Sequence, residues 1–221
     1  GVKWSNRPTF GATALGDMLF STAFRILVDG GDVKAVAEIS DTAVDLARGE
    51  LMQRRGAFNT SLEETEYLDR CRLKTARLFE AACVLGRDSV GGEDSDVVAL
   101  FGHRIGLAFQ MLDDVLDIAG PVERTGKARG TDLLDGTVTL PFIEAAKVDT
   151  ELRGYDLASL DETTAEALCD RISATGALDT VRSRAMGLIE EAKAGLTGTA
   201  IEPGQRKLLD LIADGVVLRY S

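Results

Sequence analysis

The residues best suited to chemistry lie in one short apolar run, from Phe109 to Ile118. In a helix, four polar side chains of this run would share one face: Gln110, Asp113, Asp114 and Asp117. The other positions are apolar nearly all round, which predicts a mostly buried helix. Buried carboxylates need a positive partner, because removing an uncompensated charge from water is expensive. Clustered carboxylate oxygens suit Mg²⁺, which keeps several waters and also binds substrate phosphates.

Two other interpretations of the three aspartates are open. They could form a solvated acidic face, or they could be paired with arginine and lysine side chains. The flanking apolar residues argue against an exposed helix, so we favour a metal site. Gly120 to Gly136 is long for a loop in a compact domain, and such loops are usually functional.

Several stretches of the chain resemble motifs of one family, the trans-polyprenyl diphosphate synthases. Phe109-Gln110 followed by Asp113-Asp114-x-x-Asp117 resembles the family's second aspartate-rich motif. Three further matches, in the family's order, are Gly49-Glu50-x-x-Gln53, Lys74-Thr75-Ala76 and Gly126-Lys127-x-x-Gly130-x-Asp132-Leu133. Thr137 stands where the family often has lysine. The resemblance covers essentially all 221 residues but only the later part of the family's usual chain, without its first aspartate-rich motif.

The resemblance implies a Mg²⁺-dependent prenyltransferase that joins isopentenyl diphosphate to an allylic diphosphate. The implied metal ligands are Asp113, Asp114 and Asp117. The implied catalytic residues are Lys74, Asp113 and Lys127, and the implied substrate contacts are Lys74, Thr75, Gln110, Lys127 and Gln53. An apolar tunnel between helices would take the growing tail. The alternative is an inactive fragment, or a non-catalytic subunit or binding module of a heteromeric synthase, because only one aspartate-rich wall is encoded.

Helical periodicity predicts the elements that position these residues. The expected helices cover 11–28, 33–54, 61–86, 96–118, 139–147, 161–175, 178–196 and 205–219. Ser61-x-x-Glu64 predicts a capping box for the third helix, and Asp161 is the expected N-cap of the sixth. No alternating strand pattern occurs. We therefore expect one all-α domain over residues 1–221: an antiparallel bundle of the isoprenoid synthase type, lacking the family's first helices.

Three finer expectations concern packing. Gly102 and Gly106 should let neighbouring helices approach the central helix closely. The apolar stripe of the third helix should comprise Leu68, Cys71, Thr75, Leu78 and Ala82. On the last helix, the inward-facing residues should be Leu208, Leu211, Ile212 and Val216.

Composition limits the classes of partner and compartment. The net charge of −11 argues against a nucleic-acid partner, which needs a basic surface. Three cysteines without metal-site spacing, Cys71, Cys83 and Cys169, indicate buried thiols in a reducing cytoplasm. No apolar run reaches the roughly 18 residues expected of a membrane-spanning helix. The family resemblance adds the expectation of a homodimer.

Overall fold

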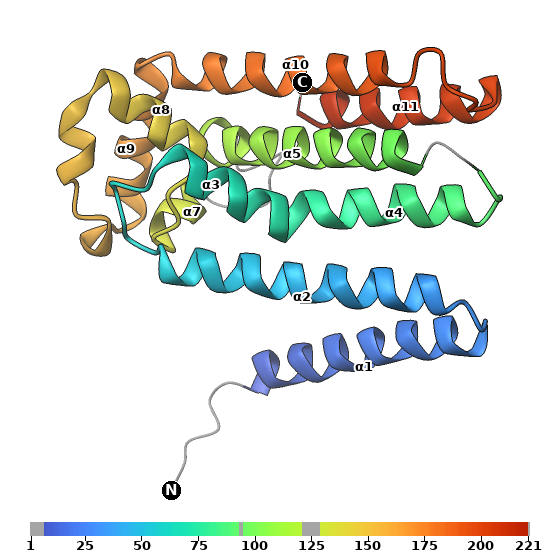
Figure 1. The fold of residues 1–221 in the computed structure, drawn as a ribbon. Coiled ribbons are helices and arrows are strands. Elements are labelled where there is room, and N and C mark those ends of the chain that lie inside the picture. Colours follow the sequence, from blue (N-terminus) through green and yellow to red (C-terminus); the bar gives the residue numbers. More distant parts are fainter. Residues whose placement is uncertain (1–6, 93–94, 121–128, 221) are drawn as a thin grey trace, which may run out of the picture. The chain divides into compact units, whose positions relative to one another are not determined.

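The computed structural model describes residues 7–92, 95–120 and 129–220, which contain helices and no strand (Figure 1). The all-α prediction is therefore confirmed. The chain divides into two compact units, Gly1–Asp41 and Thr42–Ser221. The expectation of a single domain stays a prediction.

The helices follow the predicted order, and most of their ends lie within a few residues of the predicted ones. They are α1 (Arg7–Asp29), α2 (Val33–Arg55), α3 (Glu64–Cys71), α4 (Arg77–Asp88), α5 (Ser95–Ala119), α7 (Thr131–Leu134), α8 (Leu140–Val148), α9 (Glu162–Ala174), α10 (Ala177–Gly195) and α11 (Pro203–Tyr220). A π-helical turn, η1 (Arg72–Ala76), joins α3 to α4, and two 3-10 turns, η2 (Thr150–Gly154) and η3 (Leu157–Ser159), follow α8. The short elements η1, η2, η3 and α7 were not predicted.

Helix α5 is the centre of the second unit. It packs most extensively against α4 and α10, and Figure 1 shows it between α4 on one side and α10 and α11 on the other. Met111, Val115 and Ile118 are almost completely buried, and so are Ala108 and Leu112 on a neighbouring stripe. The prediction of a mostly buried helix that is apolar nearly all round is thus confirmed. Its acidic residues belong to a helix that forms part of the core.

Glycines allow the backbones around η1 to approach closely. A Cβ atom on Gly106 would lie 2.5 Å from Cα of Ala76, and one on Gly102 would lie 2.6 Å from the carbonyl oxygen of Phe79. On α2, a Cβ on Gly49 would lie 2.6 Å from the backbone nitrogen of Lys74. Any other residue would push α2 away from η1 at Gly49, or α5 away from η1 and α4 at Gly106 and Gly102, so the glycines set the spacing around Lys74.

The π turn changes which residues of α4 face the core. The predicted stripe is correct at Cys71 but wrong at Leu78, whose side chain is 49% exposed, and at Ala82, which is also exposed. Ala76 and Ala81 are buried instead. A π turn contains an extra residue, which rotates the following helix relative to the regular pattern. The prediction failed because it assumed an uninterrupted α-helix.

The two predicted N-caps had opposite outcomes. At α9, Asp161 caps the helix as expected, with Oδ1 accepting from the backbone N–H of Thr164 at 2.8 Å. At α3, Glu63 occupies the N-cap position and makes no side-chain capping bond. The backbone N–H of Ser61 instead donates to Oδ1 of Asn59 at 3.1 Å. This local turn keeps Ser61 in the preceding loop, so the predicted capping box is wrong.

The last helix buries a different face from the one predicted. Val216 is buried as expected, but Leu208, Leu211 and Ile212 are 62%, 55% and 53% exposed. Ala213 is completely buried in their place. A small residue at the contact lets α11 pack against α5 and α10, both of which it contacts.

Helix α1 meets the length and hydropathy criteria of a membrane-spanning helix. Gly11–Asp29 of α1 is long and apolar enough to cross a membrane, and none of this window is buried within the structure. The expectation that no such segment exists is therefore wrong on these two criteria, because isolated charges such as Asp17 do not lower the mean hydropathy enough. Core helices of soluble proteins and signal sequences meet the same criteria.

Candidate active site

A polar cavity of about 250 Å³ lies within the second unit, beside the acidic face of α5. Its lining residues come from the end of α2, from α3 and η1, from α5, from α7, and from the segment between α7 and α8. They are Gln53, Arg70, Cys71, Lys74, Thr75, Gln110, Asp113, Asp114, Asp132, Thr137 and Thr139. Four sequence motifs that are far apart in the chain thus meet at one cavity.

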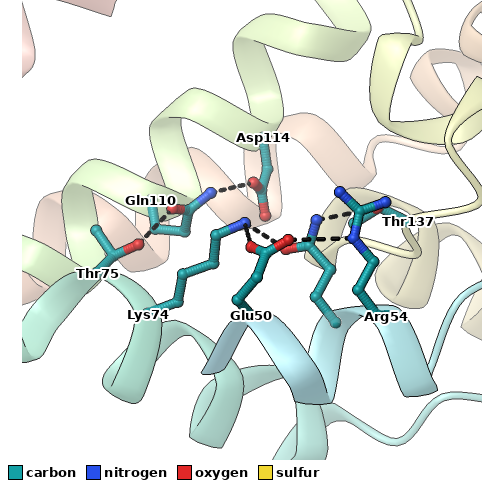
Figure 2. A network of polar contacts seen from close by, with 8 residues as sticks. Glu50, Arg54, Lys74, Thr75, Gln110, Asp114 and Thr137 are labelled. Carbon is teal, nitrogen blue, oxygen red and sulfur yellow. Dashed lines mark hydrogen bonds and ion pairs between the residues drawn. The ribbon is translucent and has the colours of Figure 1, made fainter. Parts of the chain in front are cut away.

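Lys74 is held by two acceptors on α2. Its Nζ atom donates to Oε1 of Gln53 at 2.8 Å and forms an ion pair with Oε2 of Glu50, also at 2.8 Å (Figure 2). The other carboxylate oxygen of Glu50 accepts from Nε of Arg54 at 3.1 Å. The hydrogen bond from Lys74 holds the pKa of Glu50 below its ordinary value. The ammonium of Lys74 is therefore fixed at the cavity wall by a carboxylate and an amide oxygen.

A second chain of hydrogen bonds connects η1 to α5. The hydroxyl of Thr75 donates to Oε1 of Gln110 at 2.8 Å, and Nε2 of Gln110 donates to Oδ1 of Asp114 at 2.8 Å (Figure 2). Oδ2 of Asp114 accepts from the hydroxyl of Tyr67 at 2.7 Å. Asp114 is almost completely buried. Both of its oxygens accept hydrogen bonds from this chain, which compensates part of its desolvation.

The carboxyl groups beside the cavity are crowded. Burial, together with the charge of Asp132, raises the pKa of Asp114 to about 7 and that of Asp117 to about 7. Burial and the charge of Asp113 raise the pKa of Asp132 as well. Desolvation and mutual repulsion both disfavour the ionised forms. A cation placed among these groups would relieve the repulsion.

The donor set fits a hard cation as one wall of a metal site. Asp113 on α5 and Asp132 on α7 both line the cavity, and carboxylate oxygens are the ligands that Mg²⁺ prefers. In the described ranges, no three His, Cys, Asp or Glu side chains are already grouped as metal ligands. The remaining coordination positions would fall to water and substrate oxygens, as is usual for Mg²⁺.

Asp117 does not line the polar cavity, where a metal ligand would be expected to lie. Its Oδ2 atom accepts from the backbone N–H of Asp132 at 3.2 Å. Its backbone oxygen accepts from the N–H of Gly130 at 2.9 Å. Gly130 has a φ of 72°, a conformation natural for glycine, and precedes the first residue of α7. Asp117 thus anchors the start of the helix that carries Asp132.

The structure adds residues that the site prediction lacked. Arg70 is buried, donates from Nη2 to the carbonyl oxygen of Val138 at 2.8 Å, and lies 5.3 Å from the ring centroid of Tyr67. Asp132 and Thr137 also line the cavity. Asp132 could have been chosen, because it belongs to one of the matched motifs. Lys127, which was predicted as catalytic, lies outside the described residues.

A second cavity, of about 380 Å³, is apolar and lies between α4, α5 and α11. Phe79, Phe101, Ile105, Leu208 and Ile212 are among its lining residues. It shares no lining residue with the polar cavity. The expected tunnel for an isoprenoid tail therefore stays a prediction.

The cysteines are not suited to act as nucleophiles, although Cys71 lines the polar cavity. All three are free; Cys71 and Cys169 are buried, and Cys83 is half-buried. Burial raises the pKa of Cys71 to about 12, that of Cys83 to about 11 and that of Cys169 to about 12. Thiols with such pKa values are poor nucleophiles at neutral pH.

Comparison with known proteins identifies the family. Residues 3–172 match the model of the polyprenyl synthetase family. The chain belongs to that family. It is 36% identical to the geranylgeranyl diphosphate synthase of Methanosarcina mazei over 99% of this chain and 68% of that protein. It is 35% identical to the heptaprenyl diphosphate synthase component 2 of Geobacillus stearothermophilus, over 95% of this chain and 66% of that protein.

Solved structures of polyprenyl synthases confirm the isoprenoid synthase fold. The polyprenyl synthase of Caulobacter crescentus, complexed with calcium and isoprenyl diphosphate, matches with a TM-score of 0.87 and 31% identity, over 94% of this chain and 66% of that one. The decaprenyl diphosphate synthase of Rhodobacter capsulatus matches with a TM-score of 0.84 and 29% identity, over 99% and 68%. The chain thus spans about two-thirds of the length of the polyprenyl synthetases it matches.

Proposed function

We propose that this protein is a prenyltransferase that condenses isopentenyl diphosphate with an allylic diphosphate, and that the polar cavity holds the allylic diphosphate group. One observation carries the proposal. Lys74, Thr75, Gln110 and Asp113, which come from two separate motifs, line the same cavity. Cationic and hydrogen-bonding groups on one side and carboxylates on the other form a suitable environment for a diphosphate bound with metal ions.

The reaction needs a stabilised leaving group rather than a protein nucleophile. The allylic C–O bond breaks, and its electron pair leaves with the diphosphate. The alkene of isopentenyl diphosphate attacks the resulting cation, which gives a longer allylic diphosphate, free diphosphate and a proton. Lys74 would neutralise one diphosphate oxygen and Gln110 would donate a hydrogen bond to it, while Thr75, whose hydroxyl donates to Gln110, would hold that amide at the substrate. Lys127 would add a second positive charge and Gln53 would keep Lys74 in place.

Asp113 is the residue best placed to hold Mg²⁺ directly, because it lines the cavity. Asp114 and Asp117, also predicted as ligands, would support the site indirectly, Asp114 through its hydrogen bond with Gln110 and Asp117 by holding the start of α7. When bound, Mg²⁺ would supply Lewis-acid stabilisation of the leaving diphosphate. Calcium in the Caulobacter structure supports a divalent-cation site in the family.

A second candidate function is that of one subunit in a heteromeric synthase. The Geobacillus relative is itself described as component 2 of a heptaprenyl diphosphate synthase. This chain contains one aspartate-rich motif of the DD-x-x-D type. In this case a partner chain would supply the missing catalytic residues. For the first candidate function, a prenyltransferase, we propose a homodimer located in the cytoplasm.

A turnover assay tests the proposed function. The protein is incubated with Mg²⁺, labelled isopentenyl diphosphate and allylic diphosphates of increasing length, and the products are separated by chain length. We expect Mg²⁺-dependent elongation by the whole gene product, and little turnover by a polypeptide limited to these 221 residues, because it encodes one carboxylate wall. Elongation only after a second protein is added would favour the subunit. No elongation, together with no binding of inorganic diphosphate, would contradict both candidates.

A further inference from the structure

A buried tyrosine–aspartate pair lies behind the wall of the polar cavity. Tyr67 on α3 is completely buried, and its hydroxyl donates to Oδ2 of Asp114 at 2.7 Å. Oδ1 of Asp114 accepts from Nε2 of Gln110 at 2.8 Å. Tyr67 is not among the cavity-lining residues, so it would affect a ligand only through its partners.

This arrangement sets the direction of the amide of Gln110. An amide donates only from its nitrogen and accepts only at its oxygen. Because Asp114 accepts, the nitrogen of Gln110 must face it, and the oxygen must face Thr75, whose hydroxyl donates to it at 2.8 Å. The amide nitrogen carries a second hydrogen, for which the described residues show no acceptor. Gln110 lines the cavity, so this hydrogen is a donor for a ligand oxygen.

Removing the tyrosine hydroxyl would loosen this arrangement. Oδ2 of Asp114 would lose its donor within a fully buried site, where an unsatisfied polar atom is strongly disfavoured. The terminal torsion of an aspartate is broad, so the carboxylate could turn to share its remaining donor. The amide of Gln110 would then no longer be held in a single orientation. Buried networks of this kind respond to the loss of one member as a unit.

We propose that Tyr67 and Asp114 are positioning residues, which fix the amide of Gln110 so that its nitrogen donates to an oxygen of a bound diphosphate. This inference rests on the proposed function, because it assigns the second N–H of Gln110 to a substrate oxygen. It gives Tyr67 a role that its sequence position does not indicate. It also gives Asp114 a role other than direct metal ligation.

A double-mutant cycle tests the proposal. Inorganic diphosphate is titrated calorimetrically, in the presence of Mg²⁺, into the wild type, Tyr67→Phe, Gln110→Leu and the double variant. We expect Tyr67→Phe to weaken binding by about five-fold, of the order of one hydrogen bond. In the Gln110→Leu background the same change should have no further effect, since its effect passes through Gln110. Tyr155→Phe makes the same chemical change outside the cavity and should leave binding unchanged.

The possible outcomes separate this inference from the function on which it rests. No binding of inorganic diphosphate by the wild type would overturn both. The inference alone would be overturned if the wild type bound diphosphate and Tyr67→Phe bound it with the same affinity. It would also be overturned if Tyr67→Phe weakened binding equally in the wild-type and Gln110→Leu backgrounds. If the role of Tyr67 were purely structural, Tyr67→Phe would reduce the diphosphate affinity equally in both backgrounds.

A second variant and a second measurement cover the case in which Tyr67→Phe does not fold. Asp114→Asn keeps the size of the side chain and takes the place of Tyr67→Phe in the same cycle, with the same expected result. The side-chain amide resonances of Gln110, identified by their loss in Gln110→Leu, should shift in Tyr67→Phe or Asp114→Asn and not in Tyr155→Phe. Unshifted resonances would contradict the positioning role.

Discussion

Asp113→Ala in the complete enzyme is expected to lower kcat by roughly a thousand-fold or more, because it removes a direct ligand of the metal that stabilises the leaving diphosphate. Asp113 lines the polar cavity, one helical turn after Gln110 and beside Asp132. Asp117→Ala and Asp114→Ala should lower kcat less, by about 10- to 100-fold, as expected for groups that orient a ligand. Steady-state kinetics at saturating Mg²⁺ measure the difference.

Thermal unfolding of the same three variants provides the control. Asp114→Ala leaves Tyr67 and Gln110 without their acceptor in a buried site, so it should lower the free energy of unfolding most, by about 1–3 kcal/mol. Asp113→Ala should change stability much less. The largest loss of rate and the largest loss of stability should therefore occur in different variants. If all three changed stability and left kcat near normal, the aspartates would be a solvated or ion-paired face and the metal assignment would be wrong.

Lys74→Ala is expected to weaken the binding of inorganic diphosphate by about 10- to 100-fold, which corresponds to the loss of a hydrogen bond to a charged group. Its ammonium lies at the cavity wall, held at 2.8 Å by both Glu50 and Gln53. The Lys74–Glu50 ion pair is partly exposed, so its loss should alter stability by only about 0–1 kcal/mol. Calorimetric titration in the presence of Mg²⁺ measures the affinity.

Lys147→Ala is the matched control for this variant. Lys147 also pairs with two acceptors, Glu64 at 2.9 Å and Glu144 at 2.7 Å, but it does not line the polar cavity. Its removal should leave diphosphate affinity unchanged. Equal weakening in both variants would indicate a general effect of net charge and would argue against a specific contact at Lys74.

Much of the fold and the assembly of the cavity could be predicted from the sequence. The apolar stripes around Asp113 required a buried α5, and the matches around Gln53, Lys74 and Gln110 indicated that these residues belong together. The first signal is local, because it depends on side-chain type and spacing within one helix, and the second is what the family resemblance implies. The structure indeed brings these residues to one cavity.

The finer features could not be predicted because they depend on contacts between distant segments. The π turn at Arg72–Ala76 lies in close contact with glycines of α2 and α5, and no local sequence pattern predicts such a turn. Tyr67 and Asp114 are 47 residues apart, and nothing in the helical pattern around Tyr67 indicates a polar partner. For the same reason, the hydrogen bond from the backbone N–H of Asp132 to Asp117 could not be predicted, and Asp117 as a metal ligand stays a prediction.

The most direct test of the proposed site is a crystal structure of the protein with Mg²⁺ and inorganic diphosphate. We predict a diphosphate in the polar cavity, with its oxygens within hydrogen-bond distance of Nζ of Lys74 and Nε2 of Gln110, and a metal ion on the carboxylate of Asp113. A diphosphate bound elsewhere on the protein, or one bound in the cavity with no metal at Asp113, would contradict it.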